Sequence, residues 1–441
     1  MRRLICSFAL AALPFACAFA QEVDHPWTLG ECIDYAIDHS LSLEQSAISV
    51  AQKEVSLSTA EGRRLPSLSA GASQNFSFGR GLTADNTYAN TNTTSTGFNL
   101  GSDMTLFSGF QIRNGIIMSK LDLAAATVDL EKAKDDIRVA VAQAYVQILY
   151  DKEILAVAQR QVEIDSLQLV RLEHTAASGK ASLSEVAAQK ATLAQSRSTA
   201  VQAAGTLSIA LLDLSQLLEL SSPEGFDVAV PSAEAIEPGL LPSPEDIYAD
   251  AVAIKPVIEA EKIRLDYART NVDLAKGAYM PTLSLSGGVG SNYYTSTGIG
   301  ASFFDQMKNN FSQYIGLSLS VPIFSRYSTR NQVRSAQLSL RNQELQLETV
   351  KKSLYKEIQQ AWYAAEAAVH KYYGSVSAAD AARESFNLVS ARYESGKTGI
   401  TEFNESKARY LEAESNRVRA LYEQLYQTRL LDFYRGLPLS F

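Results

Sequence analysis

The sequence predicts a mainly α-helical chain with a small β part, built from two tandem copies of one unit. Three observations predict this. Motifs recur at a fixed separation along the 441 residues, long segments have apolar residues at heptad spacing, and two windows almost free of charge alternate apolar with small residues. The composition is 46% hydrophobic and 20% charged with a net charge of −8. It disfavours nucleic acid as a partner, because phosphate binding needs clustered lysine and arginine.

The first twenty residues have the pattern of a secretion signal. Two arginines precede an apolar run, and Ala18 to Ala20 form a small-x-small cleavage site. We therefore expect residues 1–20 to be a signal peptide, with lipid attachment at Cys17 as the alternative. Cleavage after Ala20 leaves Cys32 as the one remaining cysteine, so no disulfide framework is expected.

The mature chain has the pattern of a tandem duplication. Sliding the sequence by 217 positions superposes equivalent motifs over more than a hundred residues. The coincident segments include Phe107-Ser108 with Phe324-Ser325, Gln143-Ala144 with Gln360-Ala361, and Ser178-Gly179-Lys180 with Ser395-Gly396-Lys397. The predicted domains are a first repeat over 21–220, a proline-rich linker over 221–243 and a second repeat over 244–441.

Each repeat is expected to contain the same elements in the same order. In the first, Thr28 and Glu31 have capping-box spacing at the start of a helix over 28–62. Strands at about 67–78 and 96–107 follow, then a long helix over 108–175 with a coiled-coil seam, a glycine turn and a closing helix. The second repeat has a helix over 244–277, strands at about 282–294 and 313–324, and again a long and a closing helix. No later window holds 18 consecutive apolar residues, so no second helical membrane span is predicted.

The two windows that contain the strands have almost no charge. Between Leu65 and Ser102 only Arg80 and Asp85 are charged, and between Gly277 and Ser325 only Asp305 and Lys308. Each strand alternates apolar with small polar residues, which fits either two hairpins of a soluble sandwich or the wall of a transmembrane β-barrel. Export, the missing charge and the aromatic residues near the strands favour the barrel wall. Because closed bacterial barrels start at about eight strands, the chain must then oligomerise: two copies would give about eight strands and three copies about twelve.

In the order of its motifs, the sequence resembles the TolC-like outer-membrane efflux protein family. The resemblance covers the mature chain and rests on the order of several short motifs. These are Leu29-x-x-Cys32-Ile33-x-x-Ala36, Leu65-Pro66 with Met280-Pro281, Leu106 to Gly109 with Ile323 to Ser325, and Arg392 to Lys397 followed by Glu402. The resemblance implies a homotrimer with a shared twelve-stranded barrel in the outer membrane of a Gram-negative bacterium and a coiled-coil helical tunnel through the periplasm.

The family resemblance also implies partners and a function. The chain would be the outer-membrane channel of a tripartite efflux or type I secretion system, working with a periplasmic adaptor protein and an inner-membrane pump of the RND or ABC type. The turns Ser178-Gly179-Lys180 and Ser395-Gly396-Lys397 would be the tips where the adaptor docks. Glycine suits such a turn because it adopts positive φ at little cost. The simpler alternative is that both turns are only helix ends.

The resemblance further places a constriction beside these turns. Matched by distance from the turn glycine, the constriction residues would be Glu402, Glu405 and Glu185, with Tyr393 at an aromatic gate position. Rings of such carboxylates attract cations in pores. A solvated helix face is the other interpretation of these glutamates. The best-known members hold the closed gate with an arginine where this chain has Thr398, so that latch is not implied here.

The sequence predicts no enzyme, cofactor or metal site. His25, His39, His174 and His370 are scattered, Cys32 lacks a catalytic partner, and the glycines at 287–290 lie within a strand pattern and do not open a helix. The alternative function, from a different class, is an exported soluble periplasmic coiled-coil scaffold or adhesin without channel activity.

Overall fold

The computed structural model describes residues 25–82, 86–231, 241–296 and 302–440. The predicted signal peptide and the middle of the predicted linker lie outside the described residues. The elements of the first half are α1 (Leu29–His39), α2 (Leu41–Gly62), β1 (Ser67–Leu82), β2 (Tyr88–Ser108), α3 (Gln111–Ala177) and α4 (Leu183–Leu217). Those of the second half are α5 (Pro244–Ile254), α6 (Pro256–Gly277), β3 (Thr282–Ser296), α7 (Phe303–Asn309), β4 (Ser312–Ser320), α8 (Ser328–Glu394) and α9 (Ile400–Tyr434).

The two halves have matching helices. The pairs α1 and α5, α2 and α6, α3 and α8, and α4 and α9 have 11, 22, 67 and 35 residues respectively. The short helix α7 has no counterpart in the first half among the described residues, and the sequence reasoning did not predict it. At 1.5 Å per residue, α3 and α8 are each about 100 Å long.

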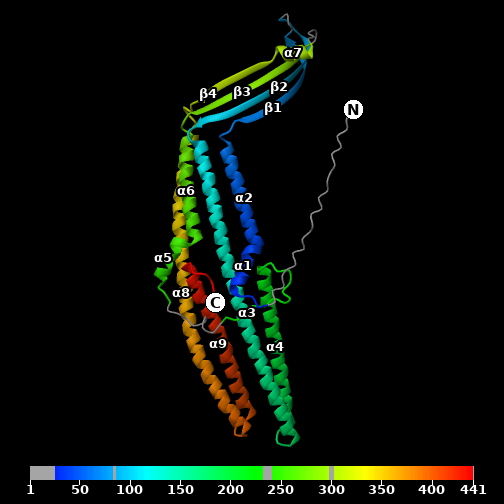
Figure 1. Cartoon of the computed structure of the whole chain (residues 1–441), viewed down its shortest axis with the longest axis vertical. Coiled ribbons are helices and arrows are strands. Elements are labelled where there is room, and N and C mark those ends of the chain that lie inside the picture. The colour runs from blue at the N-terminus through cyan, green and yellow to red at the C-terminus, as the bar shows by residue number, and fades with distance from the viewer. Residues whose placement is uncertain (1–24, 83–85, 232–240, 297–301, 441) are drawn as a thin grey trace, which may run out of the picture.

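The molecule is a long rod with a sheet at one end (Figure 1). The helices α3 and α8 run from the sheet to the far end, α2 and α6 lie beside their upper halves, and α4 and α9 lie beside their lower halves. Each long helix is therefore matched by shorter helices placed end to end. The two hairpins α3–α4 and α8–α9 form the end of the rod opposite to the sheet (Figure 1).

The helices predicted over 28–62 and 244–277 are each broken into two. Lys255 has extended backbone angles (φ −70°, ψ 127°) because the following Pro256 disfavours the helical conformation of the residue before it. Ser40 adopts nearly the same angles (φ −65°, ψ 121°) without a proline. The break at Ser40 thus had no signal in the sequence. The capping box at Thr28 and Glu31 is present as predicted, with the Thr28 N–H donating to Glu31 Oε2 over 2.8 Å.

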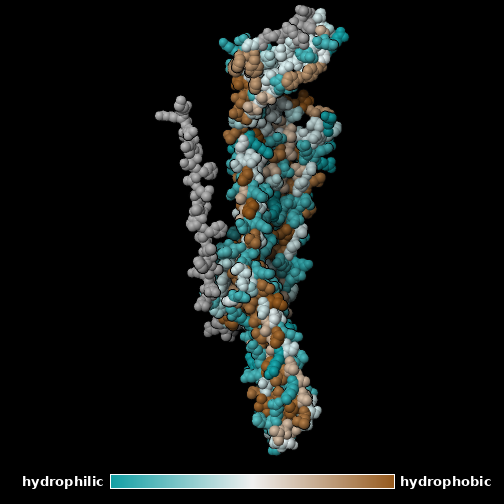
Figure 2. Space-filling view, turned by 90° about the vertical axis from the view of Figure 1, so that its right-hand side faces the viewer, coloured by the Kyte–Doolittle hydropathy of each residue, from teal (hydrophilic) through white to brown (hydrophobic). Residues whose placement is uncertain are grey.

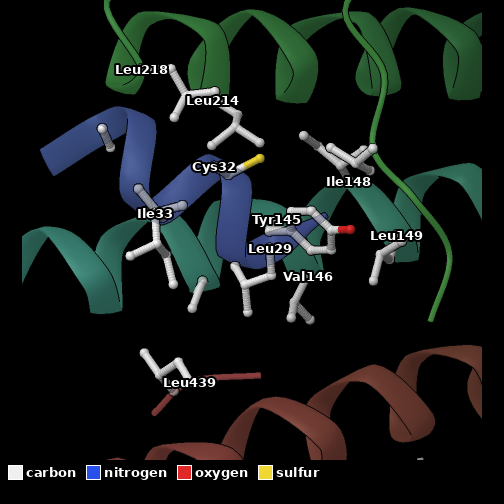
Figure 3. Close-up of a cluster of buried hydrophobic side chains, with 14 of the residues drawn as sticks. Leu29, Cys32, Ile33, Tyr145, Val146, Ile148, Leu149, Leu214, Leu218 and Leu439 are labelled. Atoms are coloured by element: carbon white, nitrogen blue, oxygen red, sulfur yellow. The ribbon is translucent and has the colours of Figure 1, made fainter. Parts of the chain in front are cut away.

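The main apolar core lies at the waist of the rod, where α1 packs between α3 and α4. Leu29, Cys32 and Ile33 of α1 contact a cluster of fully buried side chains (Figure 3). The cluster includes Tyr145, Ile148 and Leu149 of α3 with Leu214 of α4 and Leu218. The Tyr145 hydroxyl donates to the Ala229 carbonyl over 2.6 Å, which attaches the segment after α4 to α3. This core holds α1, α3 and α4 together at the waist.

The four strands form one antiparallel sheet in the order β1-β2-β3-β4. The register places the apolar residues of all strands on one face, since Ala72 pairs with Phe98, Leu100 with Val289, and Leu285 with Leu317. The alternation predicted a one-sided sheet, and the pairing confirms it. Strand β2 begins earlier than predicted because the polar residues before Thr96 pair with the end of β1. Strand β4 ends at Ser320, short of the predicted 324, and Pro322 lacks the N–H that a longer ladder would need.

Helix α4 has one property that the sequence reasoning missed. It is the one helix in the described part of the chain that is long and apolar enough to cross a membrane by composition. Polar residues interrupt its apolar residues at several places, so the search for an unbroken apolar run did not detect it. In the structure α4 packs along the lower half of α3, and 17% of its most apolar window is buried.

Candidate functional site

The two hairpin turns have the same geometry. Gly179 and Gly396 have φ of 72° and 70°, a conformation that favours glycine. The N–H groups of Lys180 and Lys397 each donate back to a carbonyl five residues earlier, over 3.0 and 2.8 Å, which satisfies the last carbonyls of α3 and α8. The residues 178–180 and 395–397 are exposed at the end of the rod. The reversal of the chain is thus where the sequence predicted it, and docking of an adaptor there stays a prediction.

The helices that leave the two turns begin differently. Ser182 and Glu185 form a capping box at the start of α4, with the Ser182 N–H donating to Glu185 Oε2 over 2.9 Å. Helix α9 has no side-chain cap at Gly399. Instead the Thr398 hydroxyl donates to the Glu402 carboxylate, and Arg392 Nη1 lies 3.7 Å from Glu402 Oε1. The charge of Glu402 is therefore partly balanced inside its own hairpin.

Glu405 lines a groove whose lining does not include Glu402. Glu405 and Glu185 line the same groove of about 530 Å³ between the first turns of α9 and α4. Its other lining residues, all in the described part of the chain, are uncharged. Glu402, Glu405 and Glu185 are the constriction residues that the family resemblance implies, and that assignment stays a prediction.

Tyr393 connects the end of α8 with α3. Its ring stacks on Phe403 with the centroids 4.9 Å apart, and its hydroxyl oxygen accepts from Gln168 Nε2 over 2.6 Å. Burial raises the pKa of Tyr393, so the phenol stays protonated at neutral pH. Next to it, Arg171 Nη2 of α3 donates to Glu394 Oε1 of α8 over 3.0 Å, in an exposed ion pair. Tyr393 thus sits where the two hairpins touch near their tips.

A buried polar cluster lies farther from the tips, and the sequence reasoning missed it. Asp165 of α3 accepts from Lys407 of α9 and from Ser196 of α4, and the Gln189 amide donates to the Asp165 carbonyl over 3.1 Å. One signal was present: Asp165 lies at seven-residue spacing between Ala158 and Leu172, which are both buried. The row also contains Asp151, seven residues before Ala158 and likewise buried. A carboxylate in such a buried row implies a buried partner, but the row alone does not identify it.

A second groove lies near the sheet. Its lining comes from α2, α3, α6 and α8, which lie side by side in that order, so it follows the concave face of this helix layer. The groove has a volume of about 930 Å³. Its charged residues pair across neighbouring helices: Lys53 Nζ lies 2.8 Å from Asp122 Oδ2, and Arg264 Nη2 lies 2.5 Å from Asp129 Oδ2. Within the described residues no group of three or more His, Cys, Asp or Glu side chains is placed to hold a metal ion.

Comparisons with known proteins agree with this architecture. The family model described as outer membrane efflux protein matches residues 32–219 and 247–436, one segment in each repeat. The outer membrane efflux protein BepC of Brucella suis is 24% identical and aligns with 77% of this chain and 70% of its own. Protein CyaE of Bordetella pertussis is 27% identical over 91% and 82% of the two chains. A solved structure of CusC superposes with a TM-score of 0.79 at 15% identity, covering 93% of this chain and 92% of the other.

Proposed function

Because the chain belongs to the outer membrane efflux protein family, we propose that three copies form a channel from a periplasmic adaptor and an inner-membrane pump to the exterior. Membership confirms the family, the outer membrane location and the transport function expected from the sequence. The fold class, a helical tunnel with a small β part, is confirmed as well. The proposal assigns no enzymatic step to the chain.

One observation supports assembly. The sheet and the layer of helices next to it both have open edges, and these edges lie on the same two sides of the molecule. Strands β1 and β4 are the edges of the sheet, and helices α2 and α8 are the edges of the helix layer. Helix α2 leads into β1, and β4 leads into α8. In lipid, an unpaired strand edge leaves backbone N–H and C=O groups without partners, which is strongly unfavourable. Pairing β4 of one copy with β1 of the next removes every edge and gives a barrel of about twelve strands from three copies.

The edge helices have apolar residues ready for such contacts. On α2, Leu41, Ile48 and Val55 repeat every seven residues and are 57%, 52% and 67% exposed. On α8, Leu338 and Leu345 have the same spacing and are likewise exposed. Heptad spacing is typical of helix pairs, and burying each such side chain contributes about 1.5–3 kcal/mol. We therefore assign α2 of one copy to the side of α8 of the next.

The sheet supports a position in the membrane rather than in a soluble scaffold. Its apolar face is exposed, with Phe78, Ile315 and Leu317 at 76%, 81% and 65%. Helix α7 contacts this face at the end of β3, through Ser291 and Tyr293. The exposed residues named above lie outside these contacts, and apolar and weakly polar side chains dominate the surface of the sheet (Figure 2). A soluble sandwich would need a second layer on this face. Lipid covers it in the proposed channel, and the small polar face lines the pore.

The hairpin tips supply the constriction in this proposal. In a trimer, Glu405 and Glu185 repeat three times around the axis, with Glu402 nearby, and Tyr393 holds the end of α8 against α3. Such carboxylates favour cations and oppose anions. The turns at 178–180 and 395–397 are the exposed ends that an adaptor can reach, and we assign docking to them.

The test places charges on the exposed apolar row of α2. In the variant Ile48→Asp with Val55→Asp, each contact with α8 of the next copy would bury an unpaired carboxylate, so the heat-dissociable oligomer should be lost from outer membrane extracts. The matched control, Ile48→Leu with Val55→Leu, keeps the apolar contact and should still run as a trimer on a semi-native gel. A trimer in the Asp variant would contradict the assembly. A soluble periplasmic monomer for the wild-type chain would instead support the scaffold alternative.

A further inference from the structure

The two edge strands of the sheet differ in length. Strand β1 has 16 residues and β4 has nine. The register of β4 with β3 runs from Thr282 to Gly290, and β3 itself continues to Ser296. Both edge strands join their helices at the same end of the sheet. When β4 of one copy pairs with β1 of the next, at least seven residues at the outer end of β1 therefore have no residue of β4 opposite them.

Helix α7 lies at the outer end of the sheet and holds the edge of β3 beyond its last partner in β4 (Figure 1). Gln306 Oε1 accepts from the Tyr294 N–H over 2.9 Å, and Gln306 Nε2 donates to the Tyr294 carbonyl over 2.8 Å. Asn310, the residue after α7, donates from Nδ2 to the Asn292 carbonyl over 2.6 Å. Amide side chains thus replace the backbone ladder there, so α7 continues the edge that β4 begins.

The apolar face of the sheet continues over α7. The ring of Phe303 packs on Tyr293 of β3 with the centroids 5.1 Å apart, and Phe304 packs on Phe303 with the centroids 5.6 Å apart. Phe304 is nevertheless 81% exposed, as is Phe78 at 76% near the outer end of β1. Each of the two edges therefore has an aromatic side chain on the same face that no neighbour in its own copy covers.

The two edges also have opposite charges. Arg80 is the one charged residue of β1, two positions after Phe78, and it is exposed. Asp305 follows Phe304 directly in α7 and is exposed as well. An aromatic residue beside a cation on one edge thus matches an aromatic residue beside an anion on the other.

We propose that α7 of one copy docks on the outer end of β1 in the next copy, with Phe304 against Phe78 and Asp305 beside Arg80. This inference rests on the proposed trimer. The contact continues the junction of β4 with β1, so the junction between copies is closed along the whole length of β1. Closure of this kind is required in lipid, where open sheet edges are strongly unfavourable.

The proposal also gives a reason why the two hairpins of the sheet differ. Strands β1 and β2 pair up to Leu82 and Tyr88, so both reach the same height. Among the described residues the first repeat has no counterpart of α7. A covering helix is needed once in each copy, at the short edge strand β4, and that is where α7 lies.

Cysteine crosslinking of the protein in outer membranes tests the contact. In a Cys32→Ser background, Phe78→Cys with Phe304→Cys should give covalent trimers on a denaturing gel after treatment with a short bis-thiol reagent. Within one copy β2 and β3 separate these positions by about 14 Å at about 4.8 Å per strand, so a shorter reagent links neighbouring copies only. The matched control, Leu68→Cys with Phe304→Cys, uses the same strand and face about 33 Å nearer the helices and should stay monomeric.

The semi-native gel separates the possible failures. Uncrosslinked chains in the Phe78→Cys, Phe304→Cys variant, when that variant runs as a trimer on the semi-native gel, would overturn the docking of α7 and leave the assembly intact. A wild-type chain that runs as a monomer would refute the proposed assembly itself, and the docking with it.

A charge exchange tests the ion pair without a reagent. Arg80→Asp alone and Asp305→Arg alone each place like charges together, so the trimer should dissociate at a temperature a few degrees lower on the semi-native gel. The combination of both restores opposite charges and should return the dissociation temperature to that of the wild type. Additive effects in the combined variant would show that the two side chains do not meet, which would overturn their pairing.

Discussion

The junction between the sheet and the helices depends on two glycines from different repeats. Gly109 lies between β2 and α3 with φ of 60°, and Gly277 ends α6. A Cβ on Gly109 would lie 2.2 Å from the Gly277 carbonyl oxygen and 2.8 Å from Met280 Cβ. Both repeats meet here backbone to backbone. Gly109→Ala is therefore expected to destabilise the junction.

The magnitude follows from two separate effects. The left-handed conformation costs an alanine about 1–2 kcal/mol. Overpacking against a neighbour that cannot move aside costs about 1–3 kcal/mol more, because the neighbour is backbone. The total is about 2–5 kcal/mol. Arg326 occupies the position in the second repeat that is equivalent to Gly109, and its φ is 51°. The chain therefore already has a residue with a side chain in this conformation there. Arg326→Ala is thus a matched control, with an expected change near zero.

Denaturant unfolding of the detergent-solubilised protein, followed by helical circular dichroism, measures the difference. Gly109→Ala should shift the midpoint to lower denaturant, and Arg326→Ala should leave it unchanged. Equal midpoints for the two variants would refute the reasoning, because they would mean that the approach of Gly109 to Gly277 does not constrain the junction.

Two further predictions concern the tip and the waist. Replacing Glu405 and Glu185 by Gln should make the channel less cation-selective, measured as the reversal potential in a salt gradient; Glu402→Gln should change it less, because Arg392 and Thr398 already contact that carboxylate. An unchanged reversal potential in all variants would place these residues outside the constriction. Burial raises the pKa of the Cys32 thiol to about 12, so at pH 8 it is almost wholly protonated and should react slowly with a maleimide until the chain is denatured. Rapid labelling of the native protein would contradict the packing of α1 at the waist (Figure 3).

Local patterns in the sequence predicted most of the elements. Seven-residue spacing, alternation and the turn glycines act through neighbouring residues, so the long helices, the one-sided strands and the turns at Gly179 and Gly396 could be predicted. The buried pair could not, because Asp165 and Lys407 are 242 residues apart and only the packing of three helices brings them together. The same holds for the groove at the tip, because its lining comes from the first turns of both α4 and α9.

The central claim is that three copies of the sheet enclose a pore with the small polar face inward. Adjacent residues of β3 test it, since Ser286 lies on the polar face and Leu285 on the apolar face. Channels with Ser286→Cys should lose current in three steps when a charged, water-soluble thiol reagent is added, one step for each copy. Leu285→Cys channels should keep their current. Block of the Leu285→Cys channel without block of the Ser286→Cys channel would contradict the orientation of the sheet, and with it the account of the pore.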